Sequence, residues 1–188
     1  IREAAYELVP ERQRRENHMR LGLALCTQTL DNSFENEELF FAAVNQINQG
    51  GPTAVHEPSQ KNVFAQLNLK AGRRSIELSD YNTAFTLFQH GISFLGDDDW
   101  ALNYQLSLDL YDEAVEAAVV INKPSEITFY TDVVVLHARC LDDKLHCKDT
   151  SSIYFICCFF PFSRFIIQTQ FRFRSVHSRE SSRNSRPS

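Results

Sequence analysis

Four residues near the end of the helical part of the sequence carry the side chains that zinc prefers. His137 and Cys140 stand three residues apart, so both side chains could share one helix face, and His146 and Cys147 follow. The second pair lacks the turn that usually separates zinc ligands. Ordinary packing and surface histidines are therefore the preferred interpretation, and no metal site is predicted.

A second group with metal-binding side chains is the run Asp97, Asp98 and Asp99, directly before Trp100. Three adjacent carboxylates could bind a divalent cation. The same residues also suit the start of a helix, where free backbone N–H groups and the helix dipole favour negative charge. We predict a helix start.

A basic run near the N-terminus could bind phosphate. It consists of Arg12, Arg14, Arg15 and Arg20. Because Glu11 and Glu16 lie among these arginines, a solvated helix face with mixed charge is the preferred interpretation.

The sequence contains no motif of a known catalytic centre. There is no Gly-rich phosphate loop, no GxSxG segment, and no cysteine, histidine and asparagine series of the protease type. His18, His56 and His90 are isolated, with no convincing acid or nucleophile partner nearby in the sequence. We therefore predict no enzyme activity and no cofactor for this chain itself.

The clearest structural pattern is a helical hairpin in residues 67–95, with a tight turn at Ser79 and Asp80. After the turn, apolar residues recur at i, i+3, i+4 and i+7, the period of one helix face. Gly72, Ala84 and Gly91 are small residues that would let the two helices approach closely. A small residue, a turn, an aromatic residue, Ala, an aromatic residue and a small residue in this order resemble a tetratricopeptide hairpin.

The remaining segments predict further helices joined by short loops. We expect them over residues 11–30, 35–48 (with a capping pair at Asn32 and Glu35), 59–78, 100–121, and from Pro124 to about Cys147. The predicted fold is all-α, an irregular antiparallel helical-hairpin array, a tetratricopeptide-like α-solenoid fragment. We divide the chain into residues 1–30, which contain a linking helix, then the repeats in 31–147, then a tail in 148–188.

Charge and cysteine content narrow the class of partner. The net charge is −5, which combines −10 over residues 1–147 (12 basic, 22 acidic) with +5 over residues 148–188 (7 basic, 2 acidic). An acidic body argues against nucleic acid as a partner, because phosphate neutralisation needs clustered Lys and Arg. Five unevenly spaced cysteines make no disulfide framework, so a cytoplasmic location is expected. The N-terminus lacks a signal peptide and a Met, as in a piece of a longer chain.

The tail differs from the rest of the sequence. It holds seven Phe between Phe155 and Phe173, then a Ser/Arg-rich end. The apolar stretch 153–167 is shorter than the roughly 20 residues of a spanning helix, so a membrane anchor is disfavoured. A Ser/Arg segment for RNA or splicing-factor contact is a second alternative. The preferred interpretation is a disordered or poorly packed tail made of translated non-coding sequence or a frameshift, because the helical period is lost abruptly.

Three strings occur together in order: IREAAYELVPERQRRENHMRLGLAL, LFFAAVNQINQG and the segment from AQLNLKAGRRSIELSDY to YDEAVEAA. Together they resemble the tetratricopeptide-like region that follows the AAA-type, origin-recognition-like ATPase module of large multidomain signalling proteins. Many of those proteins also carry protein kinase, GAF and histidine kinase or cyclase domains. The resemblance covers about residues 1–145 and implies a parent protein in ATP-dependent signal transduction. It also implies that residues 1–30 are the end of a winged-helix-like segment with a linking helix, because the AAYELVP string resembles the end of the segment that closes the ATPase part. Pro124 departs from the usual Gly-Asp-Phe, and no functional residue carries over.

These observations predict a non-catalytic scaffold that contacts a protein partner or neighbouring domains of the parent chain. Candidate contact residues are the polar positions Asn68, Arg73, Arg74 and Asn82, for which ordinary solvated surface is the alternative. Two other functions stay open: an ATP-binding kinase or ATPase activity of the parent, and a membrane-tethered adaptor that uses the Phe-rich tail.

Overall fold

The computed structural model describes residues 9–31 and 37–144, with side chains from 9–27 and 37–144. Within these ranges the chain is helical and has no strand, which confirms the predicted all-α class. The helices are α2 (Glu11–Asp31), α3 (Glu37–Gly50), the short 3-10 helix η1 (Pro52–Ala54), α4 (Pro58–Glu77), α5 (Tyr81–Phe94), α6 (Asp99–Leu102), α7 (Tyr104–Val120) and α8 (Pro124–His137). The predicted Asn32–Glu35 capping pair, His146, Cys147 and the tail lie outside the described residues.

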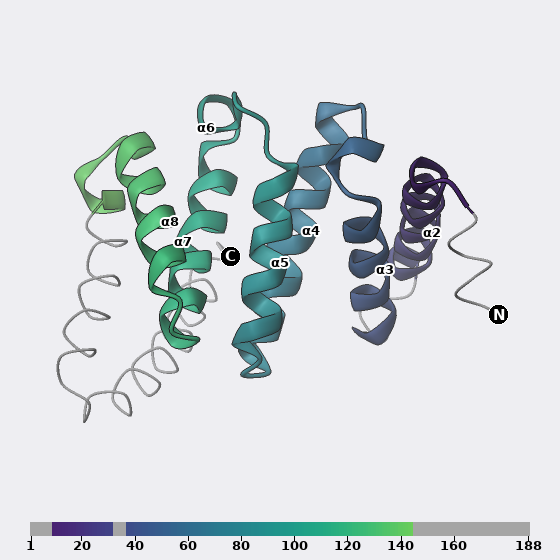
Figure 1. Cartoon of the computed structure of the whole chain (residues 1–188), viewed down its shortest axis with the longest axis horizontal. Helices are drawn as coiled ribbons and strands as arrows, with labels where there is room; N and C mark the ends of the chain where they lie inside the picture. The colour runs from purple at the N-terminus through teal and green to yellow at the C-terminus, as the bar shows by residue number, and fades with distance from the viewer. Residues whose placement is uncertain (1–8, 32–36, 145–188) are drawn as a thin grey trace, which may run out of the picture.

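Each long helix packs against its neighbours along the chain (Figure 1). The antiparallel pairs α2–α3, α4–α5 and α7–α8 are hairpins, and α5 joins the second pair to the third by packing on α7. The predicted boundary at residue 30 falls between the two helices of the first hairpin. α5 lies between α4 and α7 in the row, and α4 also contacts both α3 and α7 (Figure 1).

Two hairpin turns use the same backbone device. Ser79 after α4 and Asn122 after α7 both adopt a left-handed conformation, with φ of 63°. The amide after each donates to a carbonyl five residues back, Asp80 to Ser75 and Lys123 to Ala118. This is the bonding pattern that ends a helix and reverses the chain. At the first turn, the Asp80 carboxylate then caps α5 by accepting from the Thr83 N–H at 3.1 Å, so the predicted turn is confirmed.

Glycines let the helices of the array approach closely, as predicted for Gly72 and Gly91. A Cβ added to Gly72 would overlap the ring of Phe88, and one added to Gly91 would lie 2.6 Å from Leu110 Cδ2. Gly22 in α2 meets Ile47 of α3 in the same way. Any side chain at these positions would separate the helix axes.

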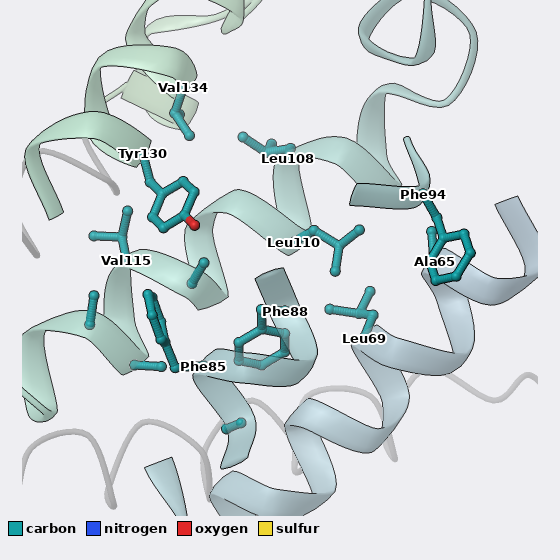
Figure 2. Packing of buried hydrophobic residues seen from close by; sticks show 14 of the residues in the cluster. Ala65, Leu69, Phe85, Phe88, Phe94, Leu108, Leu110, Val115, Tyr130 and Val134 are labelled. Carbon is teal, nitrogen blue, oxygen red and sulfur yellow. The ribbon is translucent and has the colours of Figure 1, made fainter. Parts of the chain in front are cut away.

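One apolar core runs through all three hairpins (Figure 2). Buried members from successive helices include Met19, Ile47, Phe64, Leu69, Phe85, Phe88, Leu110, Val115, Ile127 and Val134. Leu69, Phe88 and Leu110 come from α4, α5 and α7 and lie around a common centre in Figure 2. Because its members come from every hairpin, the core connects helices that are far apart in sequence.

Two predicted helices are shorter than expected. The expected helix 100–121 is interrupted at Asn103, whose φ of −127° and ψ of 46° are not helical, so α6 and α7 are separate. The expected helix to Cys147 stops at His137, since Ala138 turns to an extended ψ of 129°. The N–H of Arg139 then donates to the Tyr104 hydroxyl at 2.9 Å and not to a helical carbonyl. Both interruptions shape the corner described below.

Candidate functional site

The four predicted contact residues do not form one surface. Asn68 is fully buried between α3 and α4. Its side-chain amide exchanges two hydrogen bonds with the amide of Asn48, at 2.8 and 2.9 Å, and also donates to the Phe64 carbonyl at 3.0 Å. This pairing satisfies a buried polar group inside the array. Asn68 is therefore a packing residue in this structure, which corrects its assignment to the surface.

Arg73 and Arg74 are adjacent but connect α4 to opposite neighbours. Arg73 donates to α7, at 2.9 Å to Asp109 and 2.7 Å to Glu113. Arg74 donates to Glu37 of α3 through Nε and Nη2, and its other terminal nitrogen, Nη1, donates to Glu77 at 2.6 Å. The two arginine side chains are still 47% and 43% exposed. Solvent and a partner can therefore reach both.

Glu37, which pairs with Arg74, and Glu113, which pairs with Arg73, have pKa values shifted in opposite directions. Hydrogen bonding from Arg74 lowers the pKa of Glu37, and the charge of Arg74 adds to this effect. Burial raises the pKa of Glu113, and the nearby Arg73 offsets that only in part. For Arg73 itself, burial opposes the charged form, but Glu113 and Asp109 outweigh it and raise the guanidinium pKa. The two carboxylates that pair with Arg73 are therefore less exposed than the two that pair with Arg74.

We call the surface of Glu37, Lys70, Arg73, Arg74, Asp109 and Glu113 the arginine face. It spans α3, α4 and α7, and Lys70 completes it by lying over the ring of Phe40, 5.4 Å from the centroid. Asn82 is exposed at the start of α5, where its carbonyl accepts from the Thr86 hydroxyl. The structure thus brings Arg73 and Arg74 together on one face and leaves Asn68 in the interior.

The groups considered for metal and phosphate have local structural roles. His137 stacks on Trp100, with ring centroids 4.9 Å apart and planes 8° from parallel, and Cys140 is exposed. No group of three or more metal-ligating side chains gathers within residues 9–31 and 37–144. In the basic run, Arg12 pairs with Glu16 and Arg15 with Glu11, as expected of a mixed-charge helix face.

The Asp97–Asp99 run begins α6, which confirms the predicted helix start. The Asp99 carboxylate accepts from the Gly96 N–H and from the Asn103 side-chain amide, both at 2.5 Å. Those two bonds hold the ends of the four-residue helix together. The Asp99 carboxylate therefore binds amides that flank α6, and among the described residues no side chain caps the first N–H groups of this helix.

An aromatic corner where α6, α7 and the end of α8 meet was missed at the sequence level. We call it the α6 corner. Its rings are those of Trp100, Tyr104, Tyr111, Tyr130 and His137. Trp100 lies at the centre, with ring centroids 5.3 to 6.0 Å from those of Tyr111 and Tyr104. The stripe of aromatic residues at helical spacing was visible in the sequence, but the arrival of His137 depends on where α8 ends.

Arg139 covers the α6 corner. Its guanidinium carbon lies 4.2 Å from the Tyr104 ring centroid, and one terminal nitrogen donates to the carbonyls of Trp100 and Ala101, both at 3.0 Å. The Tyr104 hydroxyl donates to the Asp143 carboxylate, a bond that lowers the pKa of Asp143. Burial raises the pKa of the Tyr104 hydroxyl, and its hydrogen bond to Asp143 adds to this increase. The corner thus gathers acceptors and a ring face around one cation.

None of the helices in the described part of the chain is both long and apolar enough to cross a bilayer. Comparison with protein-family models, curated proteins and solved structures finds no match to this chain.

Proposed function

We propose that this chain is a non-catalytic helical-repeat scaffold, a tetratricopeptide-like α-solenoid fragment that holds a protein partner or a neighbouring domain. The sequence resemblance supports a parent in signal transduction, an AAA-type ATPase or kinase. The cysteine usage supports a cytoplasmic location.

The observation that carries this proposal is the continuous core through three hairpins, with glycine contacts between helices. In such an array each helix contacts only its neighbours, so a displacement at one end can pass to the next hairpin through packed side chains. The same arrangement leaves one side of each helix exposed for a partner.

The arginine face is the part of the surface that we assign to the partner. Its charges bridge three helices and remain partly exposed, so a partner's carboxylates can compete for Arg73 and Arg74. Binding there would change the contacts between hairpins, because both arginines already connect α4 to its neighbours. Asn82, exposed at the start of α5, is a further candidate contact residue apart from this face.

Selection from a displayed peptide library against the wild-type chain tests the arginine face. We expect peptides whose binding falls at least about tenfold, or roughly 1.4 kcal/mol, in the Arg73→Glu/Arg74→Glu variant. The matched control exchanges a pair, Arg74→Glu with Glu37→Arg, which keeps the ion pair between helices and moves the positive charge to α3. Selected peptides that bind the double reversal as well as they bind wild type would remove Arg73 and Arg74 from the assignment.

Calorimetric titration with magnesium ATP tests the non-catalytic part of the proposal. We expect no binding heat, because the sequence contains no phosphate-binding loop. A micromolar dissociation constant would overturn the scaffold function and favour a nucleotide-dependent enzyme.

A further inference from the structure

We infer that the α6 corner is a binding site for an arginine side chain of a protein partner, and that Arg139 fills this site from within the chain. The inference rests on the proposed scaffold function only in taking a protein as the ligand. It names a second surface, separate from the arginine face.

The first requirement for such a site is a pair of carbonyl acceptors. A helix leaves its last carbonyls without helical donors, and α6 has only four residues before the break at Asn103. The Trp100 and Ala101 carbonyls are therefore available at the C-terminal end of α6 to a donor from outside the helix. Both accept from the same Arg139 nitrogen at 3.0 Å.

The second requirement is an aromatic surface that a flat cation can cover. The Arg139 guanidinium carbon is 4.2 Å from the Tyr104 ring centroid, well inside the roughly 6 Å range of cation–π attraction. A planar guanidinium can stack on a ring and still donate hydrogen bonds from its edge. An ammonium group is compact and strongly hydrated, so it satisfies both partners less well. The geometry therefore favours arginine over lysine.

The third feature is the concentration of acidic residues in the segments that build the site. Asp143 is bonded to the Tyr104 hydroxyl, and Asp97, Asp98 and Asp142 are exposed close by in sequence to Trp100 and Arg139. A cationic segment of a partner would be attracted to this corner.

Exchange is feasible because Arg139 lies beyond the end of α8. Its side chain is exposed, and Ala138 before it is extended. Arg139 can leave the corner without breaking a helical hydrogen bond of α8. The chain's own arginine thus competes with an incoming one, and the affinity of a partner is reduced by the fraction of time that Arg139 occupies the site.

The test uses the full chain with Arg139→Ala, which empties the site, and the fluorescence of Trp100, the single tryptophan of the sequence. N-acetylarginine amide is the probe and N-acetyllysine amide the comparison, at matched ionic strength. We expect the arginine amide to bind Arg139→Ala at least about tenfold more tightly than wild type, because self-competition is removed. We expect the lysine amide to bind several-fold more weakly.

Two further variants separate the site from a general loss of structure. Arg139→Ala/Tyr104→Phe keeps the ring face and should retain most of the binding, whereas Arg139→Ala/Tyr104→Ala should lose it. Circular dichroism checks the fold, and Arg139→Gln replaces Arg139→Ala if the latter unfolds. Equal affinity in wild type and Arg139→Ala, no saturable response, or equal binding of the lysine amide would overturn the inference. None of these outcomes bears on the arginine face or on ATP binding.

Discussion

The α4–α5 hairpin meets its two neighbours through different kinds of junction. At the junction of α3 with α4, the reciprocal Asn48–Asn68 amide pair and the Glu37–Arg74 ion pair cross between helices. A small apolar cluster of Val44, Ala71 and Leu87 lies beside them. We call this the polar junction.

On its other side the α4–α5 hairpin meets α7. The ion pairs of Arg73 with Asp109 and Glu113 connect α4 to α7 at the surface, but between α5 and α7 the contact is made by apolar side chains. Phe88 and Leu110 are fully buried (Figure 2), and a Cβ added to Gly91 would lie 2.6 Å from Leu110 Cδ2. We call this the apolar junction. It belongs to the same core that reaches α8.

We expect the two junctions to contribute different properties, one to the stability of the fold and the other to the alignment of the helices. Burial of apolar area supplies most of the folding free energy and has little directional preference. A buried amide pair contributes less, but it satisfies both partners in only one alignment of the helices. We therefore expect the apolar junction to dominate stability and the polar junction to fix how α3 sits on α4.

The largest effect should come from Leu110→Ala in the apolar junction. Leu110 is fully buried, so the substitution removes apolar contacts and leaves a cavity, which should lower the free energy of unfolding by about 3 kcal/mol. Urea unfolding followed by circular dichroism measures the loss. Leu102→Ala is the control, since Leu102 is 78% exposed and its truncation should change stability by less than about 0.5 kcal/mol. Similar losses in the two variants would contradict the apolar junction's role.

A smaller effect is expected from Asn68→Ala in the polar junction. The substitution leaves the Asn48 amide unpaired at the junction, and we expect a loss of about 2 kcal/mol. In Asn48→Ala/Asn68→Ala neither amide is stranded, so the double variant should lose about 1 kcal/mol less than the sum of the single losses. Additive losses in this double-mutant cycle would show that the pair has no energetic coupling.

Gly91→Ala tests how closely α5 and α7 approach. The new Cβ would lie 2.6 Å from Leu110 Cδ2, and we expect a net loss of about 1 kcal/mol despite the better helix propensity of Ala. In the Leu110→Ala background the closest contact is gone and the next is Asn68 Cβ at 3.2 Å, so most of the loss should disappear. If Gly91→Ala is equally harmful in both backgrounds, then the Leu110 side chain is not what excludes a Cβ.

The sequence predicted the parts of the fold that depend on near neighbours. The turn at Ser79, the cap at Asp80 and the glycines of the central hairpin all lie within one 29-residue pattern, 67–95, and the structure contains each of them. The predicted end of α8 was wrong, because the helix stops just before Arg139. The N–H of Arg139 donates to the hydroxyl of Tyr104, 35 residues earlier in the chain. Helical period alone carries no information about such a partner.

The same reasoning applies to the candidate residues. Asn68 looked like a surface residue because it is polar, and its burial depends on Asn48, 20 residues earlier. Arg73 and Arg74 were correctly expected to be accessible, but adjacent positions in a helix gave no sign that they would connect α4 to different neighbours. Arg139 had no local motif at all, so only the fold could bring it to Tyr104.

The smallest effects concern the carboxylates that end the arginine face, and they should have opposite pH dependence. Hydrogen bonding from Arg74 lowers the pKa of Glu37, so its charge stabilises the fold above the ordinary carboxyl pKa and ceases to do so as pH falls through the lowered value. The stability difference between wild type and Glu37→Gln should therefore shrink as the pH is taken below about 4.

Glu113 should behave in the opposite way, because burial raises its pKa above that of the unfolded chain despite the nearby Arg73. The folded state then binds the proton more readily, so wild type should gain stability relative to Glu113→Gln as pH falls from neutral toward about 4. Urea unfolding at a series of pH values measures both differences, with Glu57→Gln as the control for loss of an exposed carboxylate. Parallel slopes for Glu37→Gln and Glu113→Gln would mean that burial does not distinguish the α7 side of the arginine face from its α3 side. Opposite slopes would show that the adjacent Arg73 and Arg74 pair with carboxylates in different surroundings. Glu37 of α3 would be solvated, and Glu113 of α7 would be partly buried.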